Sequence, residues 1–105
     1  MTNPTPFACN MSALSPEQRV RHRELEELLR TAIVKTRELA DGYEFEFALT
    51  PANDKALSEI TPLEHACCPF FNIAVRVEES RLFWRLSGRE GVKRFIRMEF
   101  AAWFK

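Results

Sequence analysis

The chain has 105 residues, 46% of them hydrophobic and nine of them phenylalanine, and this composition predicts one densely packed domain rather than a disordered or fibrous protein. Fifteen basic residues balance fifteen acidic ones, which removes the net positive charge that attracts nucleic acid or an anionic membrane. No apolar run is long enough to cross a membrane, and residues 1–14 lack a signal-peptide pattern, so the sequence predicts a cytoplasmic protein with neither nucleic acid nor a membrane as partner.

The first predicted helix covers 16–30. Ser15 is a favourable N-cap, Pro16 suits the first helical position, and Gln18 can close a capping box with the serine. Apolar side chains then recur at three- and four-residue spacing and predict one buried stripe, made of Leu25, Leu28, Leu29 and Ala32. His22 lies among arginines, so we expect it on the exposed face.

A β-hairpin is predicted next, with strands over 32–39 and 43–49 and a turn at Asp41-Gly42. The second strand alternates apolar side chains with glutamates, which indicates one core face and one face in water. The glutamates of the predicted strands and turns are therefore expected to be solvated rather than catalytic; they are Glu44, Glu46, Glu78 and Glu79.

A second helix is predicted over 51–67, where Thr50-Pro51 supplies its start. Pro62 lacks an amide donor and interrupts this segment. Two outcomes are open: a kink at Pro62, or a short separate helix in which Thr61 and Glu64 form a new capping box.

Alternation predicts a second hairpin with strands over 71–78 and 82–87, followed by a final apolar helix over 91–104. The resulting fold class is α+β, with an N-terminal helix and then two hairpin-helix units. Their strands form one four-stranded antiparallel sheet with the helices packed on it. Residues 1–14 are expected to form an arm that lies over a single domain of residues 15–105.

The candidate site is the segment in which Glu64 and His65 precede the adjacent pair Cys67 and Cys68. On a helix, Glu64 lies one turn before both thiols. Thiolates bind soft or borderline ions, imidazole suits zinc or copper, and a carboxylate can complete the shell. We expect the arm to bring Cys9 to this pair, which predicts a site for a thiophilic metal ion such as zinc.

Other interpretations of the cysteines remain open. Three cysteines in a reducing compartment are expected to be free thiols, and Cys67 also fits a buried packing position. A bridge between Cys67 and Cys68 would be strained, whereas Cys9 could pair with one of them across the fold. A catalytic thiol with His65 or His22 as base is a further possibility, but the sequence has no glycine-rich oxyanion loop beside it. A helix C-terminus also raises the pKa of a thiol, so the sequence favours a protein that is not an enzyme.

The C-terminal segment is apolar all round, with Phe100, Trp103 and Phe104 close together. We expect that these rings cannot all face one small core, so the sequence predicts a homodimer through the last helix. The basic residues of the same region could stack on single-stranded nucleic acid, but a charged outer helix face explains them more simply; they are Arg89, Lys93, Arg94 and Arg97.

The arm from Cys9 to Arg19, together with Glu64 and Cys67-Cys68-Pro69-Phe70, resembles a group of small uncharacterised bacterial proteins that share an arm cysteine and a Glu-x-x-Cys-Cys-Pro-Phe motif. The resemblance covers most of the chain. It implies that the arm cysteine and the adjacent pair belong to one constellation, and it carries no activity or catalytic role.

Two functions follow from the sequence. The first is a small protein that binds a thiophilic metal or uses its thiols as a redox site, with Cys9, Cys67 and Cys68 as primary groups and Glu64 and His65 as further ligands. The second is a structural or interaction domain, a homodimer in which the cysteines only pack. Metal analysis of reduced protein separates the two.

Overall fold

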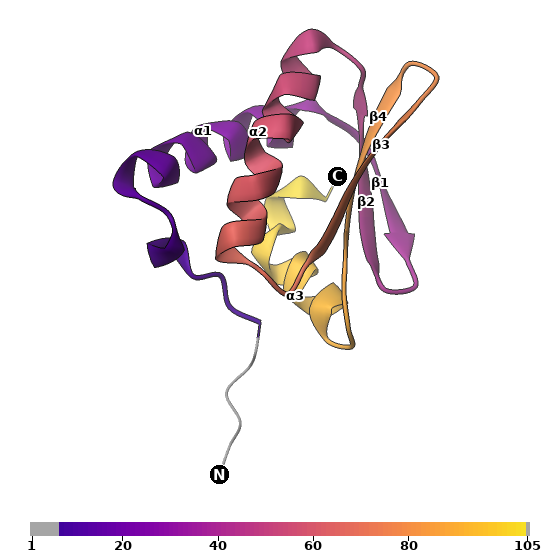
Figure 1. Cartoon of the computed structure of the whole chain (residues 1–105). Coiled ribbons are helices and arrows are strands. Elements are labelled where there is room, and N and C mark those ends of the chain that lie inside the picture. Colours follow the sequence, from indigo (N-terminus) through magenta and orange to yellow (C-terminus); the bar gives the residue numbers. More distant parts are fainter. Residues whose placement is uncertain (1–6, 105) are drawn as a thin grey trace.

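A four-stranded antiparallel sheet carries the three α-helices on one of its faces in the computed structural model (Figure 1). The structure describes residues 7–104. In chain order the elements are η1 (Met11–Ala13), α1 (Pro16–Ala32), β1 (Ile33–Leu39), β2 (Gly42–Ala48), α2 (Pro51–Cys67), β3 (Asn72–Glu78), β4 (Arg81–Ser87), α3 (Val92–Glu99) and η2 (Ala101–Trp103). The predicted α+β class and the order of its elements are confirmed, and within 7–104 no helix has the length and apolarity that a membrane crossing requires.

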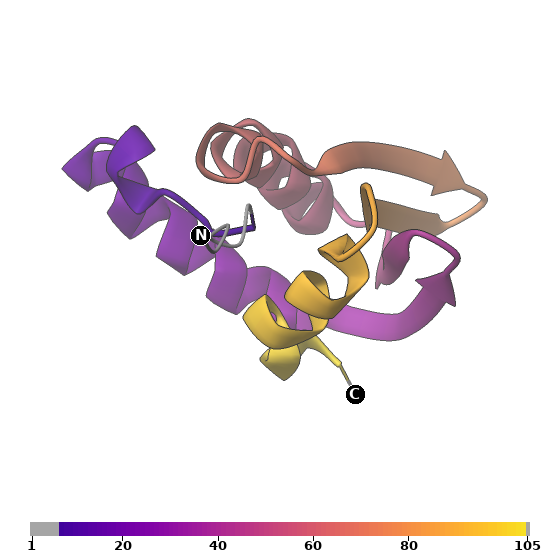
Figure 2. The same ribbon diagram turned by 90° about the horizontal axis from the view of Figure 1, so that it is seen from below.

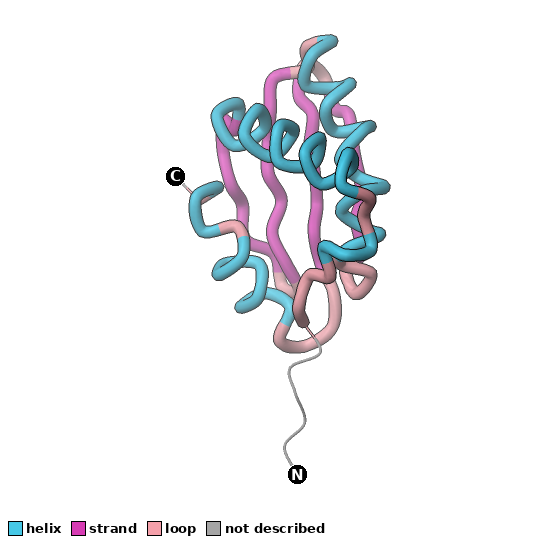
Figure 3. The backbone as a smooth tube through the Cα atoms, turned by 90° about the vertical axis from the view of Figure 1, so that its left-hand side faces the viewer, coloured by secondary structure: helices cyan, strands magenta, loops and turns pink. Residues whose placement is uncertain are grey.

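The strand order is β1-β2-β4-β3, so each hairpin contributes its second strand to the middle of the sheet. Every neighbouring pair is antiparallel, and in the central pair Phe45 lies opposite Trp84 and Phe47 opposite Leu82. These side chains are fully buried beneath the helices, which cross in front of the strands in Figure 3. Alternation of apolar and polar residues therefore places one aromatic face against the helices and leaves the other face open.

The first hairpin turns at Ala40 and Asp41 rather than at Asp41-Gly42, since Gly42 already pairs with Leu39 as the first residue of β2. Gly42 is needed for a different reason. A Cβ atom at this position would collide with the backbone carbonyl oxygen of Leu86 on β4. The glycine thus permits the close approach of the two central strands.

Helix α2 continues through Pro62 as one helix, so the separate short helix does not form. The hydroxyl of Thr61 donates to the carbonyl of Leu57 at 2.7 Å and accepts the indole N–H of Trp84 at 3.0 Å. Thr61 is therefore tied to the preceding turn and to the sheet, not to a capping box. The side chain of Glu64 points elsewhere, into the candidate site.

The final helix is shorter than predicted, because α3 ends at Glu99 and Phe100 leaves the helical conformation with φ −108° and ψ 31°. A 3-10 turn follows and rotates Trp103 onto the same core as Phe100. The ring centroid of Phe45 lies 6.3 Å from that of Phe100 and 5.3 Å from that of Trp103. The premise that these rings cannot share one core is wrong, and the homodimer loses its structural argument.

Glu44 on β2 is buried, although it was predicted to be solvated. It lies on the open sheet face beneath three arginines from the other strands, forming ion pairs with Arg37, with Arg76 at 3.2 Å and with Arg85 at 3.5 Å. Burial raises the pKa of Glu44, but the hydrogen bonds from Arg37 and Arg76 outweigh it, and the net pKa lies below its ordinary value. The burial of Glu44 results from the arginines that strand pairing places around it, and alternation along one strand does not reveal such pairing.

Candidate functional site

The candidate site lies where α2 ends and the N-terminal arm crosses it. Cys67 is the last residue of α2, and Cys68 is its C-cap, whose backbone N–H bonds to the Glu64 carbonyl at 2.8 Å. Pro69 follows and cannot continue the helix. The chain thus presents two adjacent thiol positions at a helix end, as the sequence predicted.

The arm reaches this helix end by returning from the start of α1 toward α2, as Figures 1 and 2 show. The backbone N–H of Asn10 donates to the carbonyl of Cys67 at 2.8 Å. Leu14 is buried in the core, and the ring of Phe7 lies edge-on to that of Phe70 with centroids 5.1 Å apart. Residues 1–6 of the predicted arm lie outside the described residues, and the described part is anchored to the domain at these points, so the predicted proximity of Cys9 to the adjacent pair is confirmed.

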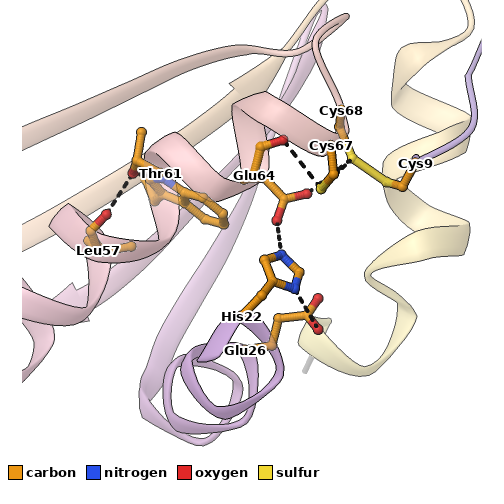
Figure 4. A network of polar contacts seen from close by, with 9 residues as sticks. Cys9, His22, Glu26, Leu57, Thr61, Glu64, Cys67 and Cys68 are labelled. Carbon is orange, nitrogen blue, oxygen red and sulfur yellow. Dashed lines mark hydrogen bonds and ion pairs between the residues drawn. A yellow bond between two sulfur atoms is a disulfide. The ribbon is translucent and has the colours of Figure 1, made fainter. Parts of the chain in front are cut away.

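The three sulfur atoms are close together, but they are not three free thiols. Cys9 and Cys68 form a disulfide across 59 residues of chain, and Cys67 is the free cysteine. The Sγ atoms of Cys67 and Cys68 lie 3.6 Å apart (Figure 4). The expectation of free thiols is wrong for Cys9 and Cys68, and the pairing across the fold replaces it because packing of the arm brings Cys9 to the helix end.

Glu64 connects the sulfurs to helix α1. Its side chain is only 2% exposed. One carboxylate oxygen, Oε2, lies 3.3 Å from the Sγ atom of Cys68, and the other, Oε1, accepts a 2.8 Å hydrogen bond from Nε2 of His22 (Figure 4). One ligand atom from each of Cys9, Glu64, Cys67 and Cys68 lies within 4.8 Å of the others, a grouping that could hold a metal ion.

His22 is the residue that sequence reasoning missed. It is 5% exposed rather than solvated, and its Nδ1 atom lies 3.6 Å from Oε1 of Glu26. Burial lowers the pKa of His22, but the hydrogen bond to Glu64 and the charges of both glutamates outweigh it, so the net pKa lies above its ordinary value. The signal was its spacing: His22 precedes Leu25 by three residues and Leu29 by seven, and these three form the buried face of α1.

The predicted stripe of α1 needs one further correction, because Leu28 is 41% exposed. Position 28 lies about 120° around the helix from His22, given 3.6 residues per turn, and shares its face with charged residues. The buried stripe is therefore shifted around α1 toward the side that faces α2, which is the side that meets Glu64.

Cys67 is unsuited to nucleophilic catalysis. Burial and then the charge of Glu64 raise the pKa of its thiol to about 12, so the thiolate is scarce near neutral pH. Its Sγ atom contacts the backbone carbonyl of Glu64 at 3.6 Å. This environment suits a packed sulfur better than an attacking one.

His65 does not join the group. Its side chain is exposed on the outer side of α2, beside Pro62, and lines a surface hollow with Asn72 and Ile73. Although it precedes Cys68 by three residues, its side chain is exposed to solvent, whereas Cys68 is buried. The imidazole close to the site is that of His22, from another helix.

Comparison of this chain with family models, with curated proteins and with solved structures finds no significant match in any of the three. The resemblance to small bacterial proteins with an arm cysteine therefore stays an expectation.

Proposed function

We propose that this protein binds a thiophilic ion through Cys9, Cys67 and Cys68 when the Cys9–Cys68 disulfide is reduced, with Glu64 as a fourth or supporting ligand. The observation that carries the proposal is the grouping of three sulfurs and one carboxylate within 4.8 Å. The third sulfur comes from a separate segment of the chain, so the grouping depends on the fold and not only on the adjacent pair.

The spacing of the sulfurs suits one shared ion. Zinc–sulfur bonds of about 2.3 Å in a tetrahedral shell place neighbouring sulfurs about 3.8 Å apart. The Sγ atoms of Cys67 and Cys68 lie 3.6 Å apart. Little movement of these two side chains is therefore needed to bond the same ion.

The disulfide makes the site dependent on redox state. Reduction adds two electrons and two protons and turns the Cys9–Cys68 bridge into two thiols, which restores the three-sulfur set. A low-molecular-weight thiol or a thioredoxin-type dithiol could supply the electrons, and would itself be oxidised to a disulfide. In the reducing cytoplasm that the sequence predicts, the bridge would open and the site would become available for an ion.

The test compares oxidised and reduced protein, using a phosphine reductant that is removed before titration with Cd²⁺. Sulfur-to-metal charge-transfer absorbance should appear with about one equivalent per reduced chain and be absent for the oxidised chain. Cys9→Ser and Cys67→Ser should each weaken binding about tenfold or more, because the shell loses a ligand. The matched control is His65→Ala, which removes an exposed neighbour and should leave the affinity unchanged. Equal binding by both redox states, or none by the reduced protein, would contradict the proposal.

The second candidate is an interaction domain whose cysteines serve only packing and arm attachment. It is favoured by the complete burial of Cys67 and Cys68. In that case Cys67→Ser should lower stability and change no metal affinity. Light scattering at high micromolar concentration tests the homodimer, whose predicted surface would have to use the exposed Met98 of α3, since Phe100 and Trp103 face the core.

A further inference from the structure

The charge of the site points to one class of ion. The buried carboxylate of Glu64 lies 3.3 Å from Sγ of Cys68, and in the part of the chain that the structure describes His22 is the only basic side chain that hydrogen-bonds to it. Cys67, Cys68 and Glu64 are almost completely buried. Net charge added at this place is therefore poorly compensated by water or by cations.

A divalent ion would leave the site strongly negative. Three thiolates around Zn²⁺ carry a net charge of minus one, and ligation by the Glu64 carboxylate makes it minus two. One imidazole, that of His22, lies against Glu64, and even a full positive charge on it would offset only half of this. Uncompensated charge in a buried environment is strongly unfavourable.

A trivalent metalloid avoids this cost. Arsenic(III) or antimony(III) with three thiolates is neutral, and its lone pair occupies the fourth position, so the metalloid needs no fourth ligand. Glu64 can then keep its hydrogen bond to His22. We infer that the reduced site selects a trivalent, three-coordinate metalloid of the arsenite class through Cys9, Cys67 and Cys68. This inference rests on the proposed function.

The ligand set agrees with three-fold rather than four-fold coordination. Glu64 has one oxygen committed to Nε2 of His22 at 2.8 Å, and His22 is held in turn by Glu26. His65, whose neutral imidazole would complete a zinc shell of three cysteines and one histidine, is exposed and outside the group. Within 7–104, what remains for an ion is three sulfurs and Oε2 of Glu64, and a three-coordinate ion needs only the sulfurs.

The binding step is an exchange without electron transfer. Arsenous acid reacts with three thiols so that three arsenic–oxygen bonds break and three arsenic–sulfur bonds form. Each thiol proton leaves with a hydroxide as water, so three waters and no net protons are released. Zinc bound by the same thiols displaces their protons into solution.

The experiment titrates anaerobically reduced protein with sodium arsenite and, separately, with Zn²⁺ in weakly buffered solution. We expect about one arsenite per chain, no net proton release, and affinity for arsenite about tenfold or more above that for zinc. Arsenic-edge X-ray absorption should give three sulfur neighbours in the wild type and two in Cys9→Ser. Glu64→Gln, whose amide retains a hydrogen bond to His22, should lower zinc affinity about tenfold more than it lowers arsenite affinity.

The outcomes separate this inference from the proposed function. Tighter binding of zinc than of arsenite, or only two sulfur neighbours around arsenic in the wild type, overturns the inference and leaves a thiol site for divalent ions. Failure of the reduced chain to bind either ion overturns both. Equal loss of zinc and arsenite affinity in Glu64→Gln, with the fold intact by circular dichroism, shows that the carboxylate serves both ions alike and also overturns the three-sulfur assignment.

Discussion

Opening of the Cys9–Cys68 disulfide should lower the free energy of unfolding substantially, because the bridge restricts the unfolded chain. It joins residues that are 59 apart. The loop-entropy relation gives about 4 kcal/mol for a closed loop of this size. With a urea dependence of about 2 kcal/mol per molar, this moves the unfolding midpoint by about 2 M.

Urea unfolding followed by tryptophan fluorescence measures this effect in oxidised protein and in protein kept reduced. The Cys9→Ser variant is the control, since reductant should not change its midpoint, which should match that of reduced wild type. The arm retains its other anchors in both proteins, including buried Leu14 and the Asn10 N–H bond to the Cys67 carbonyl. A difference below about 1 kcal/mol between oxidised and reduced wild type would refute the loop-entropy argument.

Three further predictions concern the packing around the site and the sheet. His22→Leu should lower the free energy of unfolding by about 3 kcal/mol because it leaves Glu64 buried and unpaired. Adding Glu64→Leu should recover part of this loss. Equal losses for the single and the double variant in urea unfolding would contradict the buried pair. Trp103→Ala should cost about 3–5 kcal/mol in the same assay, and a loss below about 1 kcal/mol would place Trp103 outside the core. For Glu44, burial raises the pKa, but its arginine partners lower the pKa by more than burial raises it, so the net shift is downward. Its stabilisation is present above the unfolded pKa and is lost as pH falls through the lower folded pKa. The stability gap between wild type and Glu44→Gln should therefore narrow in acid, and a gap that widens would contradict this sign.

Most elements could be predicted because their signals are local. The capping box of Ser15 and Gln18 forms as expected, and the alternation along β2 identifies the buried face of the sheet. The C-terminal helix was predicted too long because the apolar run from Phe100 onward is compatible with a helix. Its end is set by tertiary packing, which turns Trp103 toward Phe45 and Trp84.

The site could be predicted only in part, because half of it depends on contacts between distant segments. The adjacent cysteines and Glu64 lie on one helix end, and their spacing predicts their proximity. The meeting of His22 with Glu64 depends on how α1 crosses α2, which no spacing within either helix determines. The neighbouring arginines suggested an exposed histidine, and the heptad spacing to Leu29 was the stronger signal.

Ion binding and the disulfide use the same sulfurs, so an ion should restore stability that reduction removes. An ion bound only by the folded chain adds about 4 kcal/mol when its free concentration is about a thousand times its dissociation constant. This matches the loss of about 4 kcal/mol expected for the open loop. The unfolded chain keeps Cys67 and Cys68 adjacent and binds some ion, which reduces the gain.

Cys9→Ser isolates the contribution of the fold to that gain. With only the adjacent pair left, folding adds no third sulfur, so a thiophilic ion should raise the variant's unfolding midpoint much less than it raises that of reduced wild type. Reduced wild type titrated with arsenite should recover most of the midpoint of the oxidised protein. An equal rise in both proteins would show that Cys67 and Cys68 bind the ion without Cys9, and that the arm only covers them.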